Sequence, residues 1–258
     1  MRDNYILNIE DAVVRYKDTV ALKGVCLQVS QGEFVGIIGP NGSGKTTLFK
    51  AITGLVGLKS GKIEVFSKSI DTNKHAVRKK VGFIPEIGKI DPRIPVSVGE
   101  MVTMGRYSDL GLLHWPKKKD LSMVDEALDL VEIKSLMNRP VGHLSAGELQ
   151  RAVIAHYMVR KPSLFLLDEP TTSLDWKARA DIVQLMHVIN KAQGLTIMMV
   201  SHDLATLPVV CTRVVLMKNG LIVNNGIPEK MLNPENLAEL YDLSLTDMRK
   251  RLSTFNAD

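Results

Sequence analysis

The chain has 258 residues, of which 45% are hydrophobic and 24% charged, with a formal net charge of +5. This composition is typical of a soluble globular protein with one large or two small domains. The longest apolar runs, such as "LTIMMV", fall far short of the roughly 20 residues that cross a bilayer, which excludes a membrane-spanning chain. The one dense basic run, residues 117–119, favours a solvated loop over a nucleic-acid contact.

The two cysteines indicate a reducing compartment. Cys26 and Cys211 are far apart in the sequence, and neither belongs to a C-x-x-C motif, so no structural disulfide is expected. The first residues, "MRDNYILNIEDAVVRYKD", contain no apolar signal segment. We therefore expect a cytoplasmic protein that reaches a membrane only through a partner.

Hydropathy over the first 85 residues alternates in the manner of strands. "LNIEDAVVRY" and "LKGVCLQVSQGEFVGIIG" read as strands, the last of which ends at Gly39, and "GKIEVFSKSI" reads as a strand pair. A helix is expected over residues 45–53, where Gly54 stops it. These patterns predict a mixed sheet with one inserted helix.

From residue 98 to residue 160 the apolar period becomes helical in "VGEMVTMGRY", "DLSMVDEALDLVEI" and "AGELQRAVIAHYMVR". Short apolar strands then return, "SLFLLD" and "LTIMMVS", with a helix between them that ends before Gly194. Strand, helix, strand predicts a parallel sheet. "TRVVLMKNGLIVNNG" predicts a hairpin across an Asn-Gly turn.

The stretch "GPNGSGKT" fits G-x-x-x-x-G-K-[ST] and lies between a predicted strand and a predicted helix. Its glycines allow successive N–H groups to face phosphate oxygens, while Lys45 reaches the β- and γ-phosphates and Thr46 offers a hydroxyl to Mg²⁺. The predicted phosphate-binding residues are Gly39, Pro40, Asn41, Gly42, Ser43, Gly44, Lys45, Thr46 and Thr47.

The strand "LFLLDEP" ends in two carboxylates. Beside a phosphate loop, Asp168 fits the aspartate that holds Mg²⁺, and Glu169 can accept a proton from attacking water. An N-K-x-D motif for guanine is missing, since "NKAQ" lacks the aspartate. Tyr16 lies where it can stack on adenine, although a lone aromatic here is more often a cross-strand surface residue.

The stretch "LSAGE" stands at the start of the helix predicted over "AGELQRAVIAHYMVR". Ser145 and Glu148 form an S-x-x-E capping box, worth roughly 1 kcal/mol. The box leaves the small residues Ala146 and Gly147 unexplained.

Over residues 5–243, the chain resembles the ATPase subunit of an ATP-binding cassette (ABC) transporter. The resemblance rests on five stretches in this order: "GPNGSGKTT", "LSAGELQR", "LFLLDEP", "SLD" and "SHD". The resemblance implies an α/β P-loop fold with a mixed parallel sheet, an N-terminal antiparallel part and an inserted helical sub-lobe. It implies one domain over 1–258, with a core lobe at 1–86 and 162–243, the sub-lobe at about 87–161 and a C-terminal tail at 244–258.

The resemblance also implies roles for single residues. Tyr16 matches the aromatic that stacks on adenine, Glu169 the catalytic glutamate and His202 the switch histidine at the γ-phosphate. Asp175 matches the loop that communicates across a dimer. Ser145 and Gly147 match signature residues that contact ATP bound by a second copy, so that two chains sandwich two ATP molecules.

Glu86, in "VGFIPE", departs from the family, which usually has glutamine there. One unit charge about 4 Å from the triphosphate matters by about 4 kcal/mol at an effective dielectric near 20. We hypothesise that Glu86 binds Mg²⁺ directly; the alternative is a side chain that faces solvent until the transporter assembles.

The sequence indicates the transported cargo less clearly than it indicates the nucleotide site. "IDPRIPVSV" resembles ATPases of manganese and zinc importers, and "GIPEKMLNPENLAELYDLS" those of iron-siderophore and cobalamin importers. The implied partners are transmembrane permease subunits and an external substrate-binding protein, with the chain on the cytoplasmic face of the membrane. Three alternatives stay open: a non-transport ABC ATPase, such as one for iron–sulfur assembly, an ABC ATPase for a different cargo, and a binding module without turnover.

Overall fold

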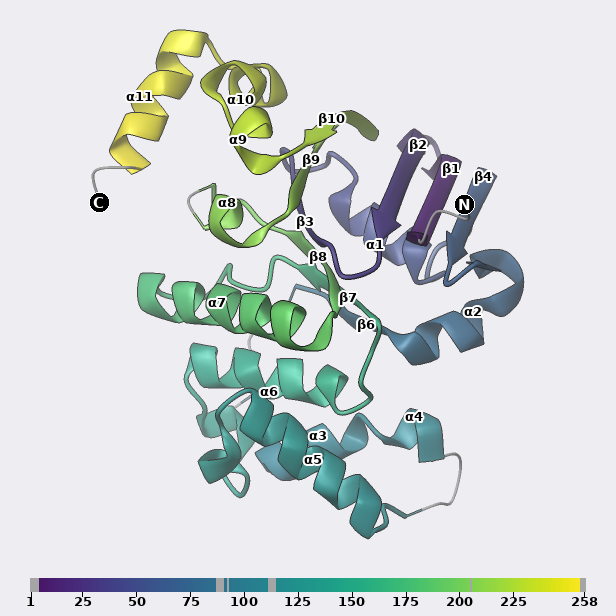
Figure 1. The fold of residues 1–258 in the computed structure, drawn as a ribbon, viewed down its shortest axis with the longest axis vertical. Coiled ribbons are helices and arrows are strands. Elements are labelled where there is room, and N and C mark those ends of the chain that lie inside the picture. The colour runs from purple at the N-terminus through teal and green to yellow at the C-terminus, as the bar shows by residue number, and fades with distance from the viewer. Residues whose placement is uncertain (1–4, 87–90, 92, 111–114, 205, 256–258) are drawn as a thin grey trace.

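The computed structural model describes residues 5–86, 91, 93–110, 115–204 and 206–255. Its strands form two sheets, as Figure 1 shows. The first is antiparallel, in the order β2 (Thr19–Ser30), β1 (Tyr5–Tyr16), β4 (Ser60–Val65) and β5 (Lys68–Ser69). The second has the order β10 (Leu221–Gly226), β9 (Arg213–Lys218), β3 (Phe34–Ile38), β8 (Thr196–Val200), β7 (Leu164–Asp168) and β6 (Val81–Ile84).

In the second sheet, β9, β3, β8, β7 and β6 are parallel, and β10 pairs with β9 as the predicted hairpin. Both faces of its central strands are buried, which is why those strands are continuous apolar runs. In β3, Val35 and Ile37 face the first sheet and helix α1 (Lys45–Ile52), whereas Phe34 and Ile38 face the other core. The predicted parallel sheet is confirmed.

Helices cover the remaining faces. They are α2 (Ile70–Lys80), α3 (Val98–Met104), α4 (Tyr107–Leu110), α5 (Lys118–Leu130), α6 (Ala146–Met158), α7 (Trp176–Gln193), α8 (Leu207–Val210), α9 (Pro228–Met231), α10 (Pro234–Tyr241) and α11 (Leu245–Phe255), with 3₁₀ turns at Lys134–Leu136 and Val141–His143. In Figure 1, α3 to α6 gather below the second sheet, where the helical sub-lobe is expected. The division into lobes at 86 and 162 stays a prediction.

The expectation of one helix and one mixed sheet within the first 85 residues is wrong. Those strands divide between the two sheets, and α2 is a second helix. Within α2 only Ile70 and Val77 are buried, and Asn73 has non-helical dihedral angles, so the sequence carries little helical periodicity.

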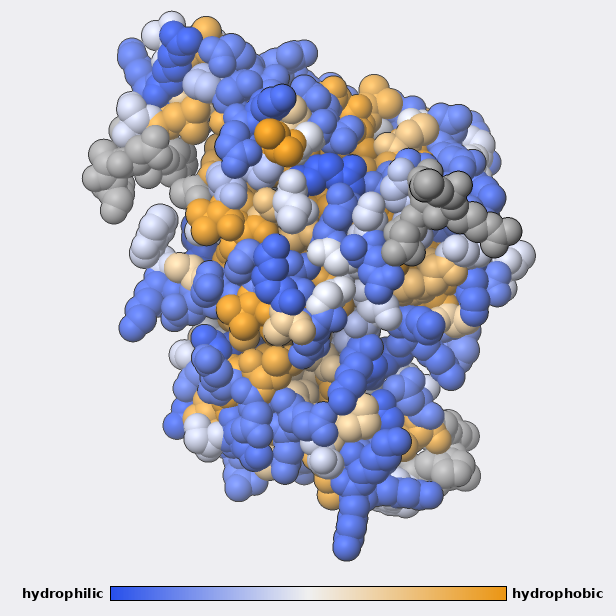
Figure 2. Space-filling view, in the orientation of Figure 1, coloured by the Kyte–Doolittle hydropathy of each residue, from blue (hydrophilic) through white to orange (hydrophobic). Residues whose placement is uncertain are grey.

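One face of the molecule is largely polar. Figure 2 shows hydrophilic side chains over most of the face in view, most densely over the helices at the bottom. Among the described residues, we find no helix with the length and apolar character that a bilayer crossing demands.

Candidate functional site

The loop between β3 and α1 fits its surroundings only with glycine. A Cβ on Gly39 would lie 2.1 Å from the carbonyl oxygen of Met217, and one on Gly44 would lie 2.8 Å from that of Ala21. Gly44 also has φ 104°, a left-handed conformation, and gives α1 no side-chain cap. The N–H groups that begin α1 are therefore available to an anion.

Lys45 is almost fully buried beneath this loop. Its Nζ donates to the carbonyl oxygens of Gly39, at 2.8 Å, and Pro40, at 3.0 Å. Burial lowers the pKa of the Lys45 ammonium, while the carboxylates of Glu169 and Asp168 raise it. A phosphate oxygen can replace these carbonyls as the acceptor.

The two carboxylates at the end of β7 have different surroundings. Asp168 is 2% exposed, accepts a hydrogen bond from Thr46 and has an Oδ1 without a hydrogen-bond partner. Burial, more than any other cause, raises the pKa of its carboxyl. A buried oxygen that lacks a donor costs stability, and Oδ1 of Asp168 is an acceptor that a ligand could use.

Glu169 turns the chain away from the strand, since its φ is 51°. Its Oε1 lies 2.8 Å from Nε2 of His202, which follows β8, and its Oε2 accepts from the Thr172 hydroxyl at 3.0 Å. Both carboxylate oxygens are thus oriented, and the side chain still lines the cleft described next. The geometry suits a base that takes a proton from a water beside the phosphate loop.

These elements surround an open cleft of about 850 Å³. Of the predicted site residues, the cleft is lined by Tyr16, Asn41, Gly42, Ser43, Gly44, Lys45, Thr46, Thr47, Glu86, Glu169 and His202. Gly39, Pro40 and Asp168 do not line it and support the residues that do, through the contacts above. The exposed ring of Tyr16 borders the cleft along with β2 residues.

Ser145, Gly147 and Asp175 do not line this cleft. Ser145 forms the predicted capping box: its N–H donates to Glu148 at 2.7 Å, and Glu148 N–H donates to its hydroxyl at 3.3 Å. Asp175 caps α7 by accepting from the N–H of Ala178 at 2.8 Å. A Cβ on Gly147 would lie 3.2 Å from that of Ala178, so the starts of α6 and α7 are close.

Several residues that line the cleft are not predicted from the sequence, among them Thr19, Val20, Ala21 and Lys23 of β2. Thr172 orients Glu169, and the Asn219–Gly220 turn lines the cleft next to β2. Gly220 N–H donates to the Ser43 carbonyl at 3.0 Å, and its carbonyl accepts from Lys23 at 2.9 Å. In the sequence, Asn-Gly signals only a hairpin turn, and nothing in it places that turn against the phosphate loop.

The donor set fits Mg²⁺ bound together with phosphate. Among residues with assigned positions, no three His, Cys, Asp or Glu side chains converge as a metal site. Thr46 and the unpartnered Asp168 oxygen supply hard oxygen ligands, and Mg²⁺ usually completes its shell with water and substrate phosphates. Glu86 is exposed at the edge of the cleft, and its charge contributes to the raised pKa of Asp168.

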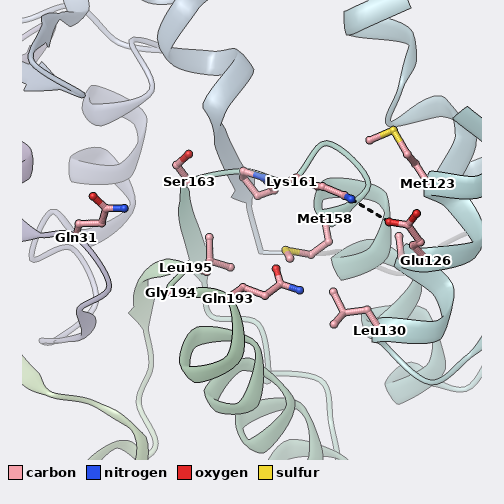
Figure 3. Close-up of a pocket in the computed structure, with 12 residues that line it drawn as sticks. Gln31, Met123, Glu126, Leu130, Met158, Lys161, Ser163, Gln193, Gly194 and Leu195 are labelled. Atoms are coloured by element: carbon pink, nitrogen blue, oxygen red, sulfur yellow. Dashed lines mark hydrogen bonds and ion pairs between the residues drawn. The ribbon is translucent and has the colours of Figure 1, made fainter. Parts of the chain in front are cut away.

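A second cavity, of about 390 Å³, lies at the N-terminal ends of β7 and β8, whereas the first cleft lies at their C-terminal ends. Figure 3 shows Met123, Glu126 and Leu130 of α5 on one side and Gln193–Leu195 on the other, with the Lys161–Glu126 ion pair, 2.9 Å, across it. None of the predicted site residues lines it.

The chain matches the family model of the ABC transporter over residues 22–172. It is 34% identical over 235 residues to the manganese transport ATP-binding protein MntB of Listeria innocua, covering 91% of this chain and 95% of that protein. It is 32% identical over 223 residues to the zinc transport ATP-binding protein TroB of Treponema pallidum, covering 86% and 82%.

Solved structures agree. The chain superposes on cbiO1 of Clostridium perfringens, part of an ABC transporter complex, with a TM-score of 0.80, 30% identity and coverage of 97% and 99%. For MJ1267, an ATP-binding cassette in its ADP conformation, the TM-score is 0.82, with 25% identity and coverage of 92% and 98%. The chain therefore belongs to the ABC transporter family, as an ATP-binding subunit with ATPase activity.

Proposed function

We propose that the cleft binds Mg²⁺-ATP and that its hydrolysis drives import of a metal ion or metal chelate through a membrane permease. The observation that carries the nucleotide part is the convergence of Lys45, the phosphate loop and an unpartnered Asp168 oxygen. Relatives named for manganese and zinc transport support the cargo class.

Each residue has a distinct role in this proposal. The loop N–H groups and Lys45 hold the β- and γ-phosphates, and Tyr16 stacks on the adenine. Thr46 and Asp168 hold Mg²⁺, which neutralises phosphate charge when bound. Glu169 accepts the proton of the attacking water at Oε1 or Oε2, and His202 and Thr172 keep that carboxylate in place.

We also propose that two copies close on two ATP molecules, with Ser145 and Gly147 of one copy facing ATP on the other. These residues lie outside the cleft of their own chain, at the start of α6, where a helix N-terminus attracts anions. Asp175, close by at the start of α7, would transmit closure between the copies.

Ser145→Asn separates the capping role from this contact. Asparagine caps a helix about as well as serine, so the free energy of unfolding should change by less than about 0.5 kcal/mol. Its bulk would obstruct the partner's γ-phosphate and reduce ATP hydrolysis at least about tenfold. Denaturant unfolding and phosphate release test both, and unchanged hydrolysis with unchanged stability would leave Ser145 only its capping role.

Glu86→Gln tests the metal role of this residue. If Glu86 binds Mg²⁺, the variant's ATP affinity should depend less steeply on Mg²⁺ concentration than the parent's, because one charged ligand is lost. Nucleotide binding across a Mg²⁺ titration measures the difference. Indistinguishable curves would remove Glu86 from the metal site.

The partners complete the proposal. Permease subunits would hold the chain at the cytoplasmic face of the membrane, an external binding protein would deliver the cargo, and nucleic acid would have no part. Co-purification of the chain with its membrane partner, followed by ATPase assays with candidate metals and chelates, tests it. Stimulation by a metal supports it, and co-purification with assembly proteins in place of a permease would contradict it.

A further inference from the structure

The last turn of α2 is held by an arginine from another part of the chain. Arg160, which follows α6, donates from Nη2 to the carbonyl oxygens of Arg78, at 3.2 Å, and Lys79, at 3.1 Å. Carbonyls at a helix C-terminus lack intrahelical donors and carry partial negative charge. A guanidinium, with several donors in a fixed plane, matches both properties.

Helix α2, which Arg160 contacts, is in turn bonded to helix α1. Arg78 of α2 donates from Nε to the carbonyl oxygen of Thr53 and from Nη2 to that of Gly54, both at 2.8 Å. Those carbonyls end α1, whose first residues are Lys45 and Thr46. Arg160 and Arg78, acting in series, therefore connect the segment after α6 to the helix that begins at the phosphate loop.

On its other side, Arg160 is tied to the helices below the sheet. Its Nε lies 3.7 Å from Oδ2 of Asp109 in α4, which also pairs with Arg106 at 2.9 Å. Arg106 pairs in turn with Asp120 of α5 at 3.1 Å. These four side chains are at most 25% exposed, so solvent and salt screen their charges only partly.

α2 also leads directly into the cleft. β6 begins at Val81 with no intervening loop, and the Lys80 carbonyl accepts from Ser163 N–H at 2.8 Å. β6 ends two residues before Glu86. In Figure 1, α2 lies above α4 at the right of the view and below α1. A displacement of α2 would therefore reach the cleft through both α1 and β6.

We propose that Arg160 and Arg78 are positioning residues that couple the orientation of helices α3–α6 to the occupancy of the phosphate loop. The coupling rests on the proposed nucleotide function of the cleft. When phosphate draws Lys45 from the Gly39 and Pro40 carbonyls, α1 adjusts. Arg78 passes the adjustment to the end of α2, and Arg160 passes it to α4 and α5.

The experiment measures the distance between two spin labels, one on exposed Cys26 of β2 and one on a cysteine introduced at exposed Leu121 of α5. It compares the parent with Arg160→Met, which keeps the side-chain stem, and Arg160→Lys, which keeps the charge but not the planar fork. The matched control is Arg151→Met. Arg151 also bonds a carbonyl and a carboxylate, of Val131 and Glu132, but both lie beside α5.

Without nucleotide, the parent and Arg151→Met should give a narrow distance distribution, and Arg160→Met a broad one. ATP should shift the parent distribution and leave that of Arg160→Met unmoved. The kcat of Arg160→Met should fall about tenfold, and that of Arg160→Lys should fall less. The KM of Arg160→Met for ATP should stay within about twofold of the parent value. If Arg160→Met does not fold, Asp109→Asn, which leaves the carbonyl contacts intact, should broaden the distribution to a smaller extent.

A parent-like distribution, ATP response or kcat in a folded Arg160→Met overturns the coupling, and so does a broad distribution in Arg151→Met. The proposed function stands apart from this result. If the parent itself neither binds nor hydrolyses ATP, both proposals fail; if the parent does both and only the Arg160 comparison is negative, the coupling alone fails.

Discussion

Glu169→Gln should reduce ATP hydrolysis by about 10²–10⁴-fold, the range typical of losing a general base, and leave ATP affinity nearly unchanged. Glutamine has the same shape, so it can keep the Thr172 hydrogen bond and the contact to His202, but it cannot accept the proton of an attacking water. Phosphate release and equilibrium nucleotide binding, measured on the same preparation, separate these two effects.

Glu229→Gln is the matched control for this substitution, because that glutamate is exposed on α9 and does not line the cleft. It should hydrolyse ATP at the parent rate. A Glu169→Gln variant as active as the control would assign the base to another group and contradict the mechanism proposed for the Glu169–His202 pair.

Asp168→Asn should show two effects of opposite sign. Without nucleotide, the free energy of unfolding should rise by about 1 kcal/mol, as is common when a functional site is relieved of an unfavourable group. The buried carboxylate lacks a partner for Oδ1, and asparagine removes its charge. In the presence of Mg²⁺ and ATP, metal affinity should fall about 10–100-fold, so the parent should gain more stability from Mg²⁺-ATP than the variant.

The pH dependence of this stability difference has a definite sign. Burial raises the pKa of Asp168, so the folded state binds its proton more tightly than the unfolded state. The cost of the charged form is fully present above the raised pKa and disappears as pH falls below the ordinary one. Denaturant unfolding at several pH values should therefore show the variant's advantage shrinking on acidification.

Asp181→Asn, on the exposed side of α7, provides the control and should change neither stability nor nucleotide binding. Equal or lower stability of Asp168→Asn at high pH, compared with the parent, would show that the buried charge of Asp168 does not destabilise the folded chain.

The sequence predicts the elements whose signal is local. β7 and β8 are short apolar runs because both of their faces are buried, and α7 ends at Gly194 in the left-handed conformation that glycine favours. The phosphate loop is predictable for the same reason, since Gly39 and Gly44 answer steric demands at their own positions.

What the sequence misses depends on contacts between distant segments. α2 has few apolar positions, and besides buried Ile70 and Val77 it is held by Arg78 and Arg160, which bond carbonyls about 25 and 80 residues away. Thr172 and Gly220 become part of the cleft only after β7, β9 and β10 assemble. The segment at Ser145–Gly147 combines a local signal with a distant contact. Its capping box is local, whereas Gly147 packs close to Ala178 of the same chain, a contact that the proposed role of Gly147 toward a second copy does not require.

The most direct test of ATP-driven pairing is the solution mass of the Glu169→Gln protein with and without Mg²⁺-ATP. Because this variant should bind ATP without hydrolysing it, we predict a mass of two chains with Mg²⁺-ATP and of one chain without nucleotide. Adding Ser145→Asn should restore the single-chain mass. A protein that keeps one mass under both conditions, although it binds ATP, would contradict the account.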